Sequence, residues 1–173
     1  FKKKKDIILK KIKIKFKNKK IAVRSSSFNE DTKYSSNAGK YKSFLNVDTK
    51  NLFKVERCIF DVLSSYNNNN NNNQILIQNM VEDVRISGVC TTLDIHNYLP
   101  NFNINYHIGS NTEVVTGGFK NTSSYIISDP KYLKSNNKFY RLSKIINKLI
   151  KIFKSNFLDI EFAINKKKEV IIL

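Results

Sequence analysis

Apolar residues that recur every three and four positions predict two strong helices. Residues 51–65 and residues 139–153 each place their apolar side chains along one side of a helix. Asn51 stands where the first of these helices would begin, and asparagine is a preferred N-cap. The apolar positions are Leu52, Val55, Ile59, Val62 and Leu63 in the first helix, and Leu142, Ile145, Ile146, Leu149, Ile150 and Phe153 in the second.

Residues 5–16 fit two different periods. Ile8, Ile12 and Phe16 recur at every fourth position, as they would along a helix. However, Ile12, Ile14 and Phe16 also recur at every second position, as they would along one face of a strand. We favour the helix.

Short apolar runs predict strands elsewhere in the chain. Residues 21–23 indicate the end of a buried strand, and residues 74–80 and 88–94 indicate two more. Residues 160–164 and 170–173, which a short polar segment separates, predict a closing β-hairpin. The mixture of helices and strands places the chain in the α+β class.

An uninterrupted run of asparagine fills residues 67–73. A tract with so little hydrophobicity cannot bury enough apolar surface to order itself. We expect a disordered loop within the domain, and we assign it no function.

Length and composition fit one soluble domain. The chain has 173 residues, of which 40% are hydrophobic, enough for one modest core and too few for two domains of ordinary size. We therefore predict a single domain over residues 1–173. No apolar run has the length that crossing a bilayer needs, so we expect a cytoplasmic protein with no membrane partner. The first residue is Phe instead of Met, from which we expect that the start is missing or processed.

The two cysteines, Cys58 and Cys90, lie far apart in the sequence. They have neither CxxC spacing nor a neighbouring histidine cluster, so the sequence indicates neither a zinc site nor a disulfide framework. We expect both to be buried thiols.

The formal net charge of +17 raises the question of nucleic-acid binding, because basic surfaces gain affinity by releasing counterions from phosphate backbones. Aromatic and basic residues do not alternate here as they do in RNA-binding motifs. A solvated basic face is the simpler explanation, and nucleic acid is a disfavoured partner. Among the 31 basic residues, the arginines are Arg24, Arg57, Arg85 and Arg141.

Arg24 follows the apolar run of residues 21–23 and begins a block of hydroxyl side chains. A strand that ended there would hold the guanidinium rigidly at its exit, and a guanidinium offers phosphate oxygens a planar fork of donors. Ser25 and the two serines after it add hydroxyls and backbone N–H groups. The segment therefore predicts a phosphate site. The alternative is an ion pair of Arg24 with Glu30 or Asp31 beside a surface loop.

Asp159 and Glu161 lie in the first arm of the predicted hairpin. Side chains two positions apart in a strand point to the same face. Two carboxylates on one face can hold Mg²⁺, which prefers oxygen ligands and usually also binds nucleotide phosphates. We predict that this pair binds Mg²⁺. The alternative is a hairpin whose polar face lies in water, with Leu158, Ile160 and Phe162 inside.

Gln78, Met80 and Val81 lie at the end of the predicted strand over residues 74–80. If this strand leads into a hinge, its backbone can offer N–H and C=O groups to adenine while the methionine packs on the base. In the alternative, the apolar residues of the strand belong to the core and Gln78 is an exposed edge residue.

Three segments resemble the ATP-binding domain of the phosphoenolpyruvate synthase and pyruvate phosphate dikinase family, and they stand in family order. Residues 22–26, AVRSS, followed by an acidic pair and a small-residue turn, resemble the family's AVRSSA segment. Residues 75–81, ILIQNMV, resemble its V-Q-x-M-V strand. Residues 158–163, LDIEFA, resemble its D-I-E-[WF]-A strand.

The resemblance implies an ATP-grasp fold, in which ATP lies between two α+β lobes, and it implies a kinase. A phosphoryl group would pass from Mg-ATP to a histidine on a separate carrier domain, and then to pyruvate or a related acceptor. The carrier and the acceptor-binding domain would belong to the same chain or to a partner chain. The resemblance implies that Arg24 and Ser25 contact the phosphates and that Arg24 is also catalytic. It implies that Gln78, Met80 and Val81 contact adenine. It implies that Asp159 and Glu161 hold Mg²⁺.

The chain also departs from the family. No Gly-Gly-Lys occurs, Leu93 stands where relatives carry a basic residue, and residues 170–173 stand where the family continues into Q-x-R-P. We therefore expect a partial ATP-grasp domain, incomplete at both ends, whose upstream lobe segment is missing. His96 and His107 lie in no carrier motif and receive no role.

Three alternatives stay open beside the kinase of pyruvate. The first is an ATP-grasp kinase of another acceptor, such as the amide of glutamine. The second is a catalytically inactive ATP-grasp interaction module. The third and least favoured is a basic nucleic-acid-binding protein.

Overall fold

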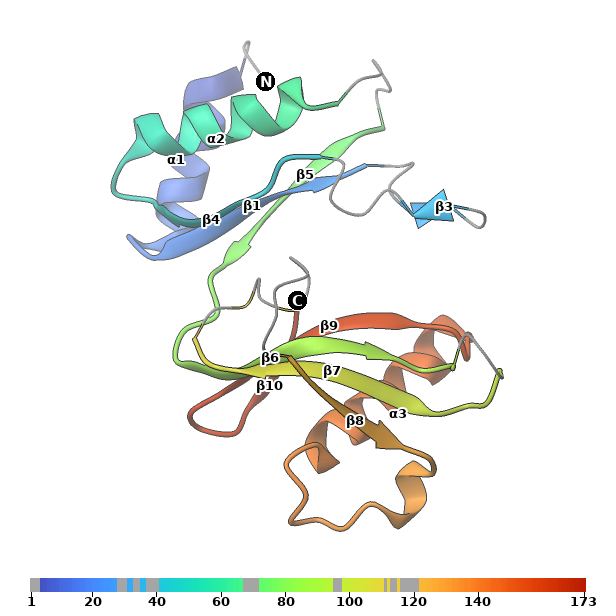
Figure 1. The fold of residues 1–173 in the computed structure, drawn as a ribbon. Coiled ribbons are helices and arrows are strands. Elements are labelled where there is room, and N and C mark those ends of the chain that lie inside the picture. The colour runs from blue at the N-terminus through green and yellow to red at the C-terminus, as the bar shows by residue number, and fades with distance from the viewer. Residues whose placement is uncertain are drawn as a thin grey trace. The chain divides into compact units, whose positions relative to one another are not determined.

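The computed structural model describes residues 4–27, 31–32, 35–36, 41–66, 72–94, 98–110, 112, 115 and 122–173 (Figure 1). The chain divides into two compact units, Phe1–Met80 and Val81–Leu173. Both units combine helix with antiparallel sheet, as the predicted α+β class requires. The interpretation of residues 1–173 as one domain stays a prediction.

The first unit consists of a small sheet with two helices on one side (Figure 1). Its elements are α1 (Lys5–Phe16), β1 (Lys20–Ser26), β2 (Asp31–Thr32), β3 (Ser35–Ser36), β4 (Phe44–Asp48), α2 (Leu52–Ser64) and β5 (Gln74–Asn79). The three-stranded sheet has the order β4-β1-β5, and both pairings are antiparallel. β2 and β3 form a separate two-stranded ladder.

Both helices of the first unit agree with the periodicity of the sequence. In α1, Ile12 and Phe16 are buried whereas Ile14 is 64% exposed, so the helical spacing and not the alternating one selects the core residues. The predicted helix over residues 5–16 is therefore confirmed. At the start of α2, the Asn51 side chain accepts a hydrogen bond from the Lys54 N–H at 3.0 Å, which confirms the predicted N-cap.

The second unit is a larger antiparallel sheet with one long helix against it (Figure 1). Its elements are β6 (Val84–Thr91), β7 (Phe102–Ile108), β8 (Ser123–Ile127), the short 3₁₀ helix η2 (Pro130–Tyr132), α3 (Tyr140–Phe153), β9 (Asp159–Asn165) and β10 (Val170–Ile172). The five strands have the order β10-β9-β6-β7-β8. β9 and β10 form the predicted closing hairpin.

Aromatic packing joins α3 to the sheet of the second unit. Phe139, directly before α3, is fully buried. Its ring centroid lies 5.1 Å from that of Tyr106 on β7, 5.4 Å from that of Tyr125 on β8 and 6.2 Å from that of Phe162 on β9. One side chain therefore connects three strands to the helix.

The central strand of this sheet depends on a glycine. Gly88 on β6 lies opposite Tyr106 of β7 and Phe162 of β9. A Cβ atom at this position would collide with the carbonyl oxygen of Asn105 and would lie 2.9 Å from the Cα of Tyr106. Since those atoms are backbone, a side chain here would push the strands apart.

Several sequence predictions need correction. The strand predicted over residues 88–94 is β6, Val84–Thr91, because Thr92 leaves the ladder and donates its hydroxyl proton to the Asn156 carbonyl at 2.7 Å. Arg24 lies inside β1 and not at its exit, because the pairing with β5 continues for two more residues. The strands β4, β7 and β8 are not among the elements predicted above.

Some predictions fall outside the described residues. These are most of the asparagine tract, residues 67–71, the histidine His96, and the motif positions Glu30, Ala38 and Gly39. The alternative ion pair of Arg24 with Glu30 or Asp31 belongs to the same group, because the side chain of Asp31 is not described either.

The aromatic cluster leads to a stability prediction. We expect Phe139→Ala to lower the free energy of unfolding of the second unit by about 3–5 kcal/mol, because it removes a fully buried ring and leaves a cavity. Phe153→Ala, at the end of the same helix, removes the same group from a side chain that is 65% exposed and should cost less than about 0.5 kcal/mol. Urea titrations followed by circular dichroism measure both, and equal losses would contradict the packing described above.

Candidate functional site

The outer face of the first sheet, turned away from α1 and α2, carries Arg24. Side chains alternate along β1, and Ile21 and Val23 belong to the core under the helices. Arg24 therefore points to the opposite side, where its backbone pairs with Leu76 of β5. Its side chain is half-buried and its Nε atom is fully buried. The strand thus fixes the backbone of Arg24, and burial of Nε restricts its guanidinium.

Gln78 lies on the same outer face as Arg24. It pairs with Ala22, so it is the diagonal neighbour of Arg24 across the β1–β5 ladder. Diagonal residues in such a ladder have Cα atoms about 7–8 Å apart, within reach of two long side chains. The structure therefore brings together two of the residues that the sequence predicts for nucleotide binding.

Ser25 takes a different position from Arg24. It pairs with Ile75, which packs against the core of the first unit, so alternation places Ser25 on the helix side. Ser26 shares the outer face with Arg24, but its backbone N–H donates a hydrogen bond to the Tyr66 hydroxyl at 3.0 Å. The serine block thus divides between the two faces of the sheet.

The predicted adenine segment lies where one compact unit ends and the other begins. Met80 is the last residue of the first unit and Val81 is the first residue of the second. The backbone N–H of Met80 donates a hydrogen bond to the Lys20 carbonyl at 3.0 Å. An adenine contact at Met80 would therefore use its carbonyl oxygen and not its N–H.

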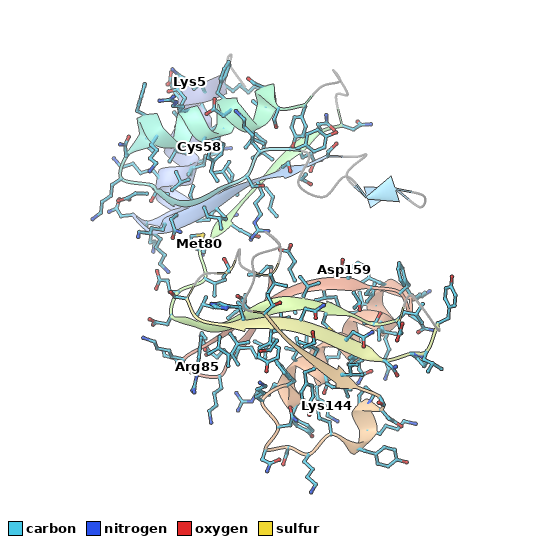
Figure 2. The ribbon with its side chains drawn as sticks, in the orientation of Figure 1. Lys5, Cys58, Met80, Arg85, Lys144 and Asp159 are labelled. Atoms are coloured by element: carbon cyan, nitrogen blue, oxygen red, sulfur yellow. The ribbon has the colours of Figure 1, made fainter. Side chains whose placement is uncertain are left out.

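The outer face of the second sheet, turned away from α3, carries Asp159 and Glu161 (Figure 2 labels Asp159). Ile160 lies between the two carboxylates in the sequence and Phe162 follows Glu161. Both belong to the core under α3. The prediction that both carboxylates share one face of β9 is confirmed. Asp159 is exposed and Glu161 is half-buried.

Polar residues of the neighbouring strands extend this carboxylate face. Asp159 lies opposite Thr91 of β6, which lies opposite Asn103 of β7. In the next row, Glu161 and Asn105 flank Val89. The rows together present carboxylate, amide and hydroxyl oxygens.

Sequence reasoning missed the contribution of β7, although a signal for it exists. Residues 102–108, FNINYHI, alternate strictly between apolar and polar side chains, which is the pattern of a strand with one buried face. Phe102, Ile104 and Tyr106 belong to the core, whereas Ile108 at the end of the strand is exposed. The polar members lie on the outer face. The polar members are Asn103, Asn105 and His107.

The donor set of the carboxylate face fits Mg²⁺. Magnesium in nucleotide sites is held by one or two carboxylates and completed by water and phosphate oxygens. Asp159 and Glu161 supply two carboxylates, and the amide of Asn103 lies in the same row as Asp159. The described residues contain no cluster of three or more His, Cys, Asp or Glu side chains that could bind a metal by itself.

The two thiols take no part in this chemistry. Cys58 and Cys90 are buried, as predicted. Burial, with the charge of Asp159 nearby, raises the pKa of the Cys90 thiol to about 12. Burial also raises the pKa of Cys58. Both thiols therefore stay protonated near neutral pH and are poor nucleophiles.

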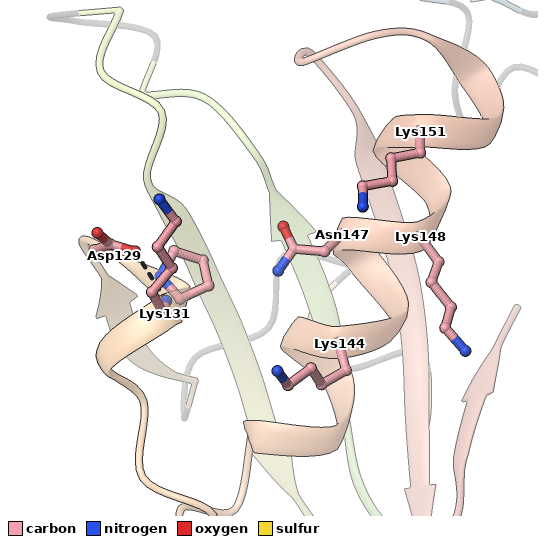
Figure 3. A pocket seen from close by; sticks show the side chains of 7 residues that line it. Asp129, Lys131, Lys144, Asn147, Lys148 and Lys151 are labelled. Carbon is pink, nitrogen blue, oxygen red and sulfur yellow. Dashed lines mark hydrogen bonds between the residues drawn. The ribbon is translucent and has the colours of Figure 1, made fainter.

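The second unit also has surface cavities besides its carboxylate face. One of them, about 490 Å³ in volume, lies between η2 and α3 (Figure 3). Lys144, Asn147 and Lys151 reach into it from α3 and Lys131 lies across from them, whereas Lys148 points away. Another cavity, lined by two arginines, lies at the start of β6. None of the described helices is long and apolar enough to span a bilayer.

Comparison with known protein families gives one match. The model of the family described as "Pyruvate phosphate dikinase, AMP/ATP-binding domain" matches residues 4–138, which is most of the chain. The matched span contains Arg24, Gln78, Met80 and Val81, and it ends before Asp159. No curated protein matches the chain.

The buried thiols lead to a prediction about reactivity. In the folded protein, we expect iodoacetamide to label Cys90 far more slowly than a free thiol at pH 8, because a pKa of about 12 leaves only about one thiol in ten thousand ionised. Because the pKa is raised, the labelling rate should remain below that of an ordinary thiol as the pH rises from 8 to 10. Peptide mass spectrometry measures the rates, and labelling in urea is the control. Rapid labelling of folded protein at pH 8 would contradict the described burial.

Proposed function

Because the chain belongs to the family of pyruvate phosphate dikinase AMP/ATP-binding domains, we propose that it binds Mg-ATP as part of a phosphotransferase. In this proposal, the phosphoryl group passes through a phosphohistidine on another domain to pyruvate or a related acceptor. The fold would be a partial ATP-grasp fold. The observation that carries the proposal is the position of Arg24, half-buried in the middle strand of a sheet and diagonal to Gln78.

Arg24 serves the phosphates in this proposal. Its backbone lies in a strand with partners on both sides and its Nε is buried, so the side chain would need little reorganisation to meet an anion. A planar fork can contact two phosphoryl oxygens at once. Phosphoryl transfer depends mainly on such positioning and on charge neutralisation, so a fixed cation on the β1 strand is the kind of group that this chemistry uses.

Asp159 and Glu161 hold Mg²⁺ in this proposal. Their shared face supports this role, because both carboxylates and the neighbouring amides offer oxygen to a hard cation. When bound, the metal would neutralise charge on the phosphate oxygens. Gln78 and the backbone of Met80 and Val81 would contact adenine, with Met80 using its carbonyl.

The first test concerns Arg24. We expect Arg24→Lys to weaken Mg-ATP binding about tenfold, because lysine keeps the charge but loses the bidentate fork. Isothermal titration measures the affinity, and thermal unfolding checks that the fold is kept. Arg57→Lys, an exposed position on α2, makes the same change elsewhere and should leave ATP affinity unaltered. Equal affinities in the Arg24 and Arg57 variants would remove Arg24 from the site.

The second test concerns the metal. We expect Asp159→Asn combined with Glu161→Gln to abolish the gain in ATP affinity that Mg²⁺ gives the unmodified chain, because amides replace both carboxylate ligands. Stability should change by less than about 0.5 kcal/mol per substitution. Glu82→Gln, at an exposed position before β6, is the matched control. Unchanged magnesium dependence in the double variant would restore the alternative of a solvated hairpin, and absence of any ATP binding by the folded chain would favour the inactive interaction module.

A further inference from the structure

A cationic cavity of about 480 Å³ lies at one end of the second sheet. Its cations are Arg85 of β6, Lys138 and Arg141 at the start of α3, and Lys168 in the β9–β10 turn. None of the described Asp or Glu side chains lines it. We call it the arginine cavity. It holds two of the four arginines of the chain, which sets it apart from the lysines spread over the surface.

Hydrogen bonds hold two of these cations in position. The Arg141 guanidinium donates from Nη1 to the Lys168 carbonyl at 3.1 Å. The Lys138 ammonium donates to the Tyr106 hydroxyl at 2.6 Å and lies 4.0 Å from the centroid of the same ring. The hydrogen bond from Lys138 lowers the pKa of the Tyr106 phenol, as a positive environment should. These charges are therefore partly fixed before any ligand arrives.

A β-bulge explains how Arg85 reaches the cavity. The pairing of β6 with β9 skips one position between Val84 and Ile86, so Arg85 is the extra residue. In a regular strand, Arg85 would point away from the face that Ile86 presents to α3. A bulge changes the direction of the extra side chain, and such bulges are common beside binding sites. Arg85 and Ile86 consequently line the same cavity.

The lining defines the kind of ligand. Two guanidinium forks and two ammonium groups fit phosphoryl oxygens, and their summed charge exceeds what a simple carboxylate would balance. Ser135 and Asn136 add uncharged polar groups at the rim. Ile86 and Ile164 provide an apolar wall, and the volume exceeds what a phosphate group alone would fill.

The arginine cavity is separate from the two carboxylates assigned above to Mg²⁺. Ile86 and Ile164, which line it, belong to the core under α3. Asp159 and Glu161 lie on the other face of the same sheet. A ligand in the cavity would therefore be a second ligand.

We propose that the arginine cavity binds a small phosphorylated molecule through its phosphoryl oxygens, at a site distinct from that of Mg-ATP. The ligand's organic part lies against the isoleucine wall. Because the shared chemistry is the phosphoryl group, inorganic pyrophosphate is the appropriate probe, and succinate is the carboxylate comparison.

The experiment is a titration of the full chain with pyrophosphate, in EDTA and about 150 mM salt, so that Mg²⁺ is absent and loose surface charge is screened. We expect saturable binding, with succinate much weaker. Arg141→Gln and Arg85→Gln should each weaken pyrophosphate binding about tenfold or more, because each removes charge-assisted hydrogen bonds. Both side chains are exposed, so the fold should tolerate the changes.

Matched controls decide the outcome. Arg57→Gln on α2 makes the same substitution at an exposed position, and Lys144→Gln removes one charge from α3 beside the other cavity. Both controls should bind pyrophosphate like the unmodified chain. Absence of binding by the folded chain overturns the proposal, as does equal binding of succinate or a loss in Lys144→Gln as large as in Arg141→Gln. A loss confined to Arg24→Lys also overturns it and assigns the pyrophosphate to the proposed ATP site.

Discussion

One-sided burial of the strands is the constraint on which the candidate site depends. Each of the two larger sheets has helix packed against one face, so every second side chain on its strands is mostly apolar and the others become available for chemistry. Ile21 and Val23 fix β1 in this way and leave Arg24 on the other side. Ile160 and Phe162 do the same for Asp159 and Glu161. A shift of one residue in either strand would place charged groups in the core, at a cost that no hydrogen bond in an apolar layer would offset.

One-sided burial restricts the packing most strongly around Phe139. Its ring is packed against three strands, and Gly88 lets the middle strands approach closely underneath. Such dense packing transmits displacements instead of absorbing them. The start of α3 and the β6 bulge lie at the end of this packed region, so Arg141 and Arg85 are attached to rigid elements although their side chains reach the surface.

The sequence predicted helices and paired carboxylates well because both are local patterns. The spacing of Ile12 and Phe16, the cap at Asn51 and the two-residue spacing of Asp159 and Glu161 need no knowledge of distant residues. The position of Arg24 inside β1 depends on pairing with β5, which lies about fifty residues further along the chain, and no local pattern contains it. β7 could have been predicted from its alternation, whereas the bulge at Arg85 could not, because it exists only relative to β9.

The burial of Arg24 distinguishes it from the other basic residues of the chain. Most of the 31 basic residues are lysines, and Arg57, Arg85 and Arg141 are exposed, so their charges are largely screened by water and salt. Arg24 is half-buried, with its Nε atom out of contact with solvent. A cation in such a place interacts more strongly with an anion than a solvated one does, and it also costs more to keep there. A general excess of lysine explains an exposed charge, but it does not explain a guanidinium built into the middle strand of a sheet.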